Sequence, residues 1–434
     1  MVRRATVREF AAASLWVLPA AWALVAMVAG AVVSHVTIGP GSVWAPLAFQ
    51  GTADDARTLL ITIVSTVVTV IALVLGLTVV ALQLSSTQFS PRLLRNFLRD
   101  KPTQRVLSVF LSTFTYSTAG LYTVGIASGV RVENFPRLAV TGAILLLFAS
   151  LAMVIYFADH LAHSIQIDAI TELVQRGTVE VVRMKPGDSE GPPPTPPPWA
   201  ITVPATQSGY VQAAHPHLLL SLAIEKGVTV LVRPRVGEHM VAGTTLAWVW
   251  RSSARDPRPD PAAFTKLLAE AVHIGFERTL EQDAAFGIRQ LVDVACKALS
   301  PAVNDPYTAV QAIDHLSVIF CALAVRPLGD DVAAAPDGAV MVVVPGRRFA
   351  DYLSTMCGLI RRYGASEPTV AVALLRLLDE CAETLTQPSR LTSIVEQATL
   401  IRDDAERKIP QPADALAIRE AAAALADKLS NRVG

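Results

Sequence analysis

The feature that most constrains this chain is a set of four apolar segments, each long enough to cross a lipid bilayer. A helix needs about 20 residues to span the hydrocarbon core. The clearest segment is 58–82, "TLLITIVSTVVTVIALVLGLTVVAL", which contains no charged residue. The others cover about 11–33, 106–128 and 137–157. These segments predict an integral, multi-pass membrane protein with four transmembrane helices.

The composition indicates that a soluble part follows the membrane part. Of 434 residues, 52% are hydrophobic and only 17% are charged, whereas soluble domains carry about 25% charged residues. The apolar excess lies in the first 160 or so residues, which predicts a transmembrane domain over 1–159. The formal net charge is zero, so bulk charge gives no reason to expect a nucleic-acid partner.

The basic residues of the loops predict the orientation. Arg3, Arg4 and Arg8 precede the first span, and five basic residues lie over 92–105, between spans two and three. Positive charge is retained on the cytoplasmic side. Both termini are therefore expected in the cytoplasm, and the protein in the bacterial plasma (inner) membrane. The first apolar run is longer than that of a signal peptide, so we expect it to be retained as a span.

The cytoplasmic loop carries a basic amphipathic stretch, "SPRLLRNFLRDKP", in which leucines and Phe97 alternate with arginines at helical spacing. Such a helix is expected at 91–101 on the anionic lipid of the inner leaflet. The alternative is that it packs against the soluble part.

Beyond the membrane domain, the sequence predicts an α+β region. Residues 160–185 extend the fourth helix, and a proline-rich linker follows over 186–199. Alternating Val-rich segments with turn glycines at Gly237 and Gly243 predict a small β module over 200–255, similar to a barrel-sandwich half-repeat. From 256 to 434 the pattern is mostly helical, with "GAVMVVVP" as one short strand.

Hydroxyl side chains cluster on the second and third spans. Small and hydroxyl residues let membrane helices pack closely, but the same residues around an oligomer axis could line a water-filled path. Both interpretations stay open, and the absence of charge in these spans argues against a proton relay. The candidate pore-lining residues are Thr62, Ser65, Thr66, Thr69, Ser108, Ser112, Thr115 and Tyr116. The candidate inner mouth comprises Gln83, Gln88, Arg92 and Asn96.

The stretch "ALSPAVNDPYTAVQAID" joins two helical patterns in the soluble region. Asp305 can cap a helix that begins at Pro306, which makes this a helix–loop–helix joint. The alternative is an anion or carboxylate pocket at the exposed helix end. The residues that either reading involves are Arg289, Ser300, Asn304, Asp305 and Tyr307.

These segments carry a family resemblance. "EQDAAFGIRQLVDVACKALSPAVNDPYTAVQAID", "QLSSTQFSPRLLRNFLRD" and "RYGASEPTV" resemble the bacterial family of predicted membrane proteins catalogued as domain of unknown function 2254. The resemblance covers nearly the whole chain. It implies an integral membrane protein with a large cytoplasmic C-terminal part, and it supplies no catalytic residues.

Other polar residues give no recognisable catalytic or cofactor motif. Asp159, His160 and His163 share a helical face, where a polar patch is expected and a metal site is the alternative. Asp283 and Asp293 are expected to be surface or interhelix charges. The four cysteines, none in a CxxC pair, are expected to be reduced and buried, and the chain is expected to need no cofactor or metal. The cysteines are Cys296, Cys321, Cys357 and Cys381.

The expected function follows from these features. Uncharged, hydroxyl-rich spans favour a homo-oligomeric, channel-like protein with a cytoplasmic regulatory domain. The alternative is a non-conducting scaffold or sensor, whose cytoplasmic helices bind a ligand or a partner protein. An enzyme is not expected.

Overall fold

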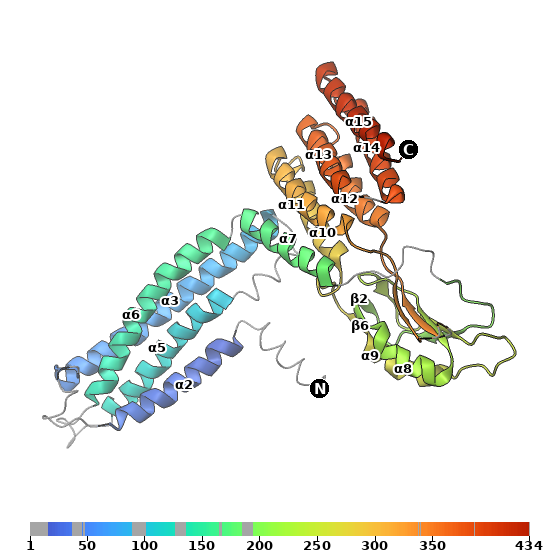
Figure 1. Ribbon diagram of the computed structural model, residues 1–434. Coiled ribbons are helices and arrows are strands. Elements are labelled where there is room, and N and C mark those ends of the chain that lie inside the picture. The colour runs from blue at the N-terminus through green and yellow to red at the C-terminus, as the bar shows by residue number, and fades with distance from the viewer. Residues whose placement is uncertain are drawn as a thin grey trace. The chain divides into compact units, whose positions relative to one another are not determined.

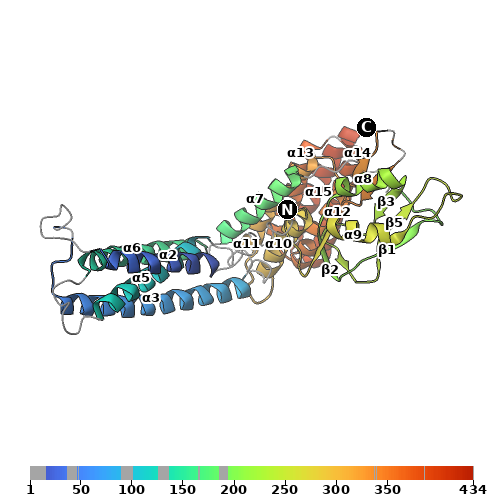
Figure 2. The same cartoon turned by 90° about the horizontal axis from the view of Figure 1, so that it is seen from below.

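The computed structural model describes residues 16–36, 46, 48–88, 101–125, 136–164, 167–184, 194–336, 338, 340–385 and 387–433. The chain divides into two compact units, Met1–Ala169 and Ile170–Gly434. Figures 1 and 2 show the elements of both units.

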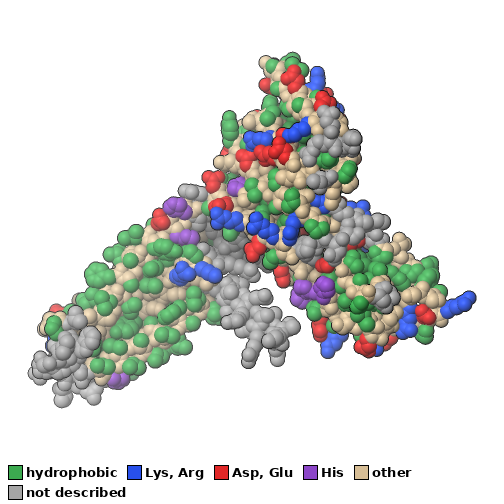
Figure 3. All heavy atoms as spheres, viewed as in Figure 1, with side chains coloured by type: hydrophobic (Ala, Val, Ile, Leu, Met, Phe, Trp, Pro, Cys, Tyr) green, Lys and Arg blue, Asp and Glu red, His purple; other side chains and the backbone are tan. Residues whose placement is uncertain are grey.

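Among the described residues, the first unit contains four helices, which correspond to the four predicted spans (Figure 1). Helix α5 contacts each of the other three, so it occupies the middle of the bundle. Hydrophobic side chains cover the face of this unit that is seen in Figure 3. The helices are α2 (Val17–Ser34), α3 (Ala53–Gln88), α5 (Lys101–Gly125) and α6 (Arg137–Ser164).

Two close helix crossings hold α5 in place. A Cβ at Gly142 of α6 would lie 2.3 Å from the Tyr116 hydroxyl oxygen, and a Cβ at Gly30 of α2 would lie 2.9 Å from the Tyr116 carbonyl oxygen. Only glycine leaves room for the Tyr116 side chain and backbone here. These contacts are the small-residue crossings expected between membrane helices.

Four described helices are long and apolar enough to span a bilayer, and the set differs from the predicted one by one member. It contains Val17–Ser34, Ala53–Gln83, Arg137–His163 and Pro306–Ala324. Helix α5 is absent from it because its many hydroxyl side chains make it less apolar than the other three. Pro306–Ala324 is helix α11 of the second unit, where half of its apolar window is buried among other helices.

The second unit contains two small sheets in its described part. The five-stranded sheet has the order β1-β5-β3-β8-β7, and only the β3–β8 pair is parallel. Its strands are β1 (Ile201–Pro204), β3 (Thr229–Val232), β5 (Thr245–Trp250), β7 (Asp331–Ala334) and β8 (Met341–Val344). The antiparallel three-stranded sheet, β4-β2-β6, consists of β4 (His239–Met240), β2 (Gly209–Ala214) and β6 (Val272–Gly275).

The predicted barrel-sandwich half-repeat is not confirmed. Strands β3 and β5 pair with each other as expected, but β4 between them in sequence belongs to the other sheet. Strand β3 also pairs with β8, which comes about a hundred residues later and is the short strand predicted at "GAVMVVVP" within the mostly helical region. Gly237 and Gly243 do adopt positive φ values of 88° and 81° in the turns of this segment.

Helices surround the two sheets and form the rest of the second unit. Helices α8 (Pro216–Lys226) and α9 (Pro261–Ala271) contribute Leu219, Phe264 and Leu268 to the core beneath the sheets. The remaining helices are α7 (Ile167–Met184), α10 (Ala284–Ala298), α11 (Pro306–Ala324), α12 (Phe349–Tyr363), α13 (Pro368–Thr384), α14 (Pro388–Lys408) and α15 (Pro412–Val433). Several begin with proline, which loses no hydrogen bond in a first turn.

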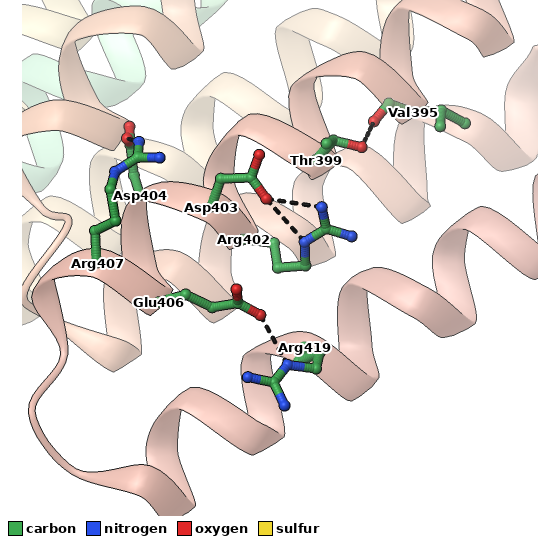
Figure 4. A network of polar contacts seen from close by, with 8 residues as sticks. All are labelled: Val395, Thr399, Arg402, Asp403, Asp404, Glu406, Arg407 and Arg419. Atoms are coloured by element: carbon green, nitrogen blue, oxygen red, sulfur yellow. Dashed lines mark hydrogen bonds and ion pairs between the residues drawn. The ribbon is translucent and has the colours of Figure 1, made fainter.

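Polar contacts connect these helices at their surfaces. Arg419 of α15 donates to Glu406 of α14 at 2.7 Å (Figure 4), and Arg361 of α12 pairs with Asp404 of α14. Helix α7 lies against α10 and α11. Gln175 of α7 makes a hydrogen bond of 2.5 Å with His315 of α11. Thr178 of α7 lies so close to Gly287 of α10 that a Cβ there would overlap its hydroxyl.

Candidate functional site

One face of α3 carries a continuous row of small and hydroxyl residues. They are spaced alternately by four and three positions, which keeps them on one side of a helix. All are exposed in the first unit, and a Cβ at Gly76 would meet no atom within 4 Å. We call this row the outward stripe: Thr58, Thr62, Ser65, Thr69, Ala72 and Gly76.

The opposite face of α3 makes the contacts with the bundle. Leu60, Ile63, Val67 and Val74 are each at most 2% exposed. A helix with one buried apolar face commonly turns large apolar residues to the lipid on its other faces. Here the face most distant from the bundle instead carries the smallest and most polar side chains of the span. Thr66 is also exposed, at the flank of the stripe.

The hydroxyls of the stripe that have described bonds use their own helix. Thr62 donates to the Thr58 carbonyl oxygen at 2.8 Å, and Thr69 donates to the Ser65 carbonyl oxygen at 3.0 Å. These bonds satisfy the hydroxyl hydrogens. The oxygen lone pairs still face outward, where a neighbouring helix or water could use them.

The α5 hydroxyls lie inside the bundle, in contrast to those of α3. Ser108, Ser112 and Tyr116 are buried, and Thr115 donates to the Ala23 carbonyl oxygen of α2 at 2.9 Å. A further buried pair, which the sequence did not single out, joins Thr113 of α5 to Ser150 of α6 at 2.8 Å. The structure therefore places the eight predicted pore-lining residues on two separate surfaces, and only those of α3 face outward.

The predicted inner mouth is described only in part. Gln83 is exposed near the C-terminal end of α3. The Gln88 side chain, together with Arg92 and Asn96, lies outside the described residues, as does the predicted amphipathic helix.

The interhelical loop between α10 and α11 has the geometry of a joint. Asp305 caps α11 by accepting from the Thr308 backbone N–H at 3.1 Å and from its hydroxyl at 2.6 Å. These bonds lower the pKa of the carboxyl, with the Thr308 hydroxyl as the largest cause. Asn304 takes the left-handed conformation, with φ of 50°. Both Asp305 oxygens are thus used within the loop.

The other residues of this predicted site do not converge on a ligand position. The Ser300 hydroxyl donates to the Lys297 carbonyl oxygen at 2.7 Å, and Arg289 pairs with Asp293 one turn along α10 at 2.8 Å. Tyr307 is 75% exposed. Each of these polar groups therefore has a local structural role or faces solvent.

The metal site that the sequence left open as an alternative at Asp159, His160 and His163 is not formed in the described part of the chain. No group of three or more His, Cys, Asp or Glu side chains that could hold a metal ion occurs there. All four cysteines are free, and Cys357 and Cys381 are buried. Burial raises the pKa of Cys357 to about 12 and that of Cys296 to about 11, so these thiols remain protonated at neutral pH.

Asp283, which the sequence suggested to be a surface or interhelix charge, is a buried helix cap. It is 3% exposed and accepts from the Phe286 backbone N–H at 3.1 Å, which makes it the N-cap of α10. Arg278 donates to the same carboxylate at 2.6 and 2.9 Å. Burial raises the pKa of the carboxyl, and the nearby Arg278 charge opposes that shift.

Comparison with known proteins places this architecture in a family. A family model described as "Predicted membrane protein (DUF2254)" matches residues 12–380. The uncharacterized protein Rv1290c of Mycobacterium tuberculosis is 42% identical over 97% of this chain and 82% of its own length. The uncharacterized protein Mb1321c of Mycobacterium bovis shows the same identity and coverage. No solved structure matches the chain. The chain belongs to the DUF2254 family of predicted membrane proteins.

Proposed function

We propose that this protein is a homo-oligomer in the membrane in which α3 helices from several copies face a common axis. Their outward stripes would line an uncharged, channel-like path through the bilayer. The observation that carries the proposal is the exposure of Thr58, Thr62, Ser65 and Thr69 on the face of α3 most distant from its own bundle.

The residues beside the stripe support this orientation. Ile61, Val68 and Leu75 are 44%, 49% and 46% exposed, and they lie on the neighbouring face of α3. Large apolar side chains suit contact with lipid, whereas small and hydroxyl residues suit close helix contact or water. A single helix thus offers one face to lipid and another to a partner.

The stripe is long enough to cross the membrane interior. From Thr58 to Gly76 a helix rises about 27 Å at 1.5 Å per residue, and the hydrocarbon core is about 30 Å thick. The stripe contains no ionisable residue, so a path along it would have no charged binding site. Selectivity would then depend on diameter and on hydroxyl and backbone oxygens.

The orientation predicted from loop charges completes the proposal. Both termini and the second unit would lie in the cytoplasm of a bacterium, with the protein in its inner membrane. Residues 91–101 would contact anionic lipid beside the inner end of α3. The role is non-enzymatic: the second unit would regulate or assemble the membrane unit.

A non-conducting scaffold or sensor is the second candidate, and the bonds of the stripe favour it. Thr62 and Thr69 satisfy their hydroxyl hydrogens within α3, so the stripe needs no water. Two stripes could pack against each other as a dry seam. The two candidates share the same oligomer contact and differ in whether water enters it.

Cysteine substitutions along α3 test both points. Thr62→Cys, Ser65→Cys and Thr69→Cys would be compared with Ile61→Cys, Val68→Cys and Leu75→Cys as matched controls on the lipid-facing side. Oxidative cross-linking in native membranes should give dimers from the stripe positions and few from the controls. A cationic thiol reagent should modify the stripe positions if the path is wet.

The result has three informative outcomes. Cross-linking with modification supports the channel-like path, and cross-linking without modification supports the dry scaffold. Equal or stronger cross-linking at Ile61, Val68 and Leu75 would overturn the proposed contact. The native thiols interfere little, because burial raises the pKa of all four cysteines above its ordinary value.

A further inference from the structure

The second unit contains a cavity that the membrane proposal does not use. Its volume is about 70 Å³, and its walls come from α7, the segments before α10 and α12, and the ends of the sheet. Segments distant in sequence therefore close around one space. Prominent among its walls are Val181, Arg235, Asp283, Val344, Arg347 and Tyr352.

The volume limits what the cavity can hold. A water needs about 10–15 Å³ of such volume, so the space corresponds to about five waters. A group of four or five heavy atoms, such as a carboxylate with a short tail, fits this size. The space cannot enclose a whole nucleotide or drug-sized ligand, because pockets for such ligands are about 300 Å³ or larger.

Most charges around the cavity neutralise one another. Arg278 donates two hydrogen bonds to Asp283, and Arg235 lies 3.2 Å from the carboxylate of Asp351. Arg347, the other cation of the walls, makes no ion pair in the described part of the chain, and the Asp283 charge acts on it from nearby.

Two wall residues carry hydrogen-bond donors that a ligand could use. In the part of the chain that the structure describes, neither the Arg347 guanidinium nor the Tyr352 hydroxyl makes a hydrogen bond. A guanidinium stays charged in proteins and binds carboxylates through two parallel bonds. Burial raises the pKa of Tyr352 to about 12, so its hydroxyl keeps the proton that it can donate.

The acidic neighbours and the apolar walls select among anions. Asp283 lies near enough to Arg347 for their charges to interact, and a second negative charge on a ligand would be repelled by this carboxylate. A dianion such as phosphate is therefore disfavoured relative to a monoanion. Val181, Leu323 and Val344 add an apolar wall that suits a short alkyl tail.

We propose that this cavity binds a small aliphatic monocarboxylate, held by the Arg347 guanidinium and the Tyr352 hydroxyl. The ligand would contact Val181 and Val182 of α7, the first helix of the second unit. It would thus join α7 to the sheet and to α12, and binding would rigidify this helix. The inference goes beyond the proposed path along α3 and does not rest on it.

Calorimetric titration of the purified full-length protein in detergent tests the proposal. The probes are sodium acetate, propionate and butyrate, with sodium chloride and inorganic phosphate as comparison anions. At least one carboxylate should bind more tightly than phosphate and chloride. Arg347→Gln should weaken its binding at least tenfold, and Tyr352→Phe should weaken it several-fold.

Helix α12, which carries Tyr352, also supplies matched controls. Arg362 and Tyr363 of α12 are exposed, so Arg362→Gln and Tyr363→Phe should leave the affinity unchanged. If Arg347→Gln does not fold, Arg347→Lys keeps the charge but loses the paired bonds, and should still weaken binding. Filling the space with Val181→Phe should abolish binding in a folded protein.

The outcomes separate this inference from the membrane proposal. The absence of carboxylate binding by the folded wild-type protein would overturn it, as would unchanged affinity in Arg347→Gln or tighter binding of phosphate. None of these measurements depends on oligomer formation or on conduction, so either proposal can fail while the other stands.

Discussion

The hydroxyl oxygen of Thr113 on α5 lies 2.8 Å from that of Ser150 on α6, and both side chains are buried. This bond ties two helices of the first unit together in its buried interior. It distinguishes hydroxyls that hold the bundle from those of the outward stripe, which bond within α3.

Replacing Thr113 should therefore lower the stability of the first unit. Thr113→Val keeps the shape but removes the hydroxyl, and hydrogen bonds between membrane helices contribute about 0.6 kcal/mol on average and up to about 1.7 kcal/mol. Unfolding of the purified protein by denaturing detergent measures the loss. Thr69→Val, on the exposed face of α3, is the control and should change stability less. Equal losses in both variants would contradict the distinction.

Gly237 and Gly243 form a second matched pair. Both have positive φ, but a Cβ at Gly237 would lie 2.1 Å from the Asp283 carboxylate oxygen, whereas one at Gly243 would meet nothing within 4 Å. Gly243→Ala should cost about 1–2 kcal/mol from the left-handed backbone alone. Gly237→Ala should cost clearly more, because it also displaces the buried carboxylate and its Arg278 bonds. Similar melting temperatures for the two variants would argue against this clash.

Asp305 should make a measurable contribution to the stability of the second unit. Loss of the cap in Asp305→Ala is expected to cost about 0.5–2 kcal/mol, whereas Asp305→Asn preserves the cap. Thermal unfolding at pH 7 compares the two. A melting temperature unchanged by Asp305→Ala, with the loss of a ligand shown to bind at this loop, would favour the ligand-pocket interpretation of the loop instead.

The same carboxyl should also make stability depend on pH. Its pKa in the folded chain lies below the ordinary carboxyl value of 3.8, because the Thr308 hydroxyl and backbone N–H donate to the ionised form. The folded state thus binds the proton less tightly than the unfolded state, so the contribution is present above pH 3.8 and is lost as the pH falls through the folded pKa. Asp305→Asn should flatten this part of the stability profile. An identical acid profile in wild type and variant would show that other groups govern it.

How far the sequence predicted these features depends on how local their causes are. The four helices of the first unit follow from long apolar runs, and the α11 cap follows from Asp305 and Pro306 beside each other. The role of each hydroxyl cluster was not predictable, because it depends on which helix lies in the middle. Thr115 and Thr69 look alike in sequence, yet only the former reaches another helix.

Long-range contacts account for the remaining differences. The pairing of β3 with β8 joins segments about a hundred residues apart, and no local periodicity encodes it. Asp283 was expected to be a surface or interhelix charge, but it is buried against Arg278 and Gly237. The sequence did suggest a turn at Gly237, but a turn glycine does not reveal that the Asp283 carboxylate lies beside it.

Arg390 shows how a charged residue can serve the core of the second unit. It is 2% exposed, and its guanidinium donates to the Ala324 and Arg326 carbonyl oxygens at 2.7 and 2.9 Å at the end of α11. Arg390→Met should destabilise the unit by about 1.5–3 kcal/mol for each such bond lost. Arg402→Met on the same helix, whose described bonds go to the adjacent Asp403, should cost about 1 kcal/mol or less. Chemical denaturation of both variants makes the comparison, and equal losses would contradict the capping role.

The channel-like path along α3 is tested most directly by single-channel recording from the purified oligomer in planar bilayers. The account predicts discrete unitary currents, which a cationic thiol reagent reduces in Thr69→Cys but not in Val68→Cys. Silence across voltage, tension and pH, from protein shown to be folded and oligomeric, would contradict it.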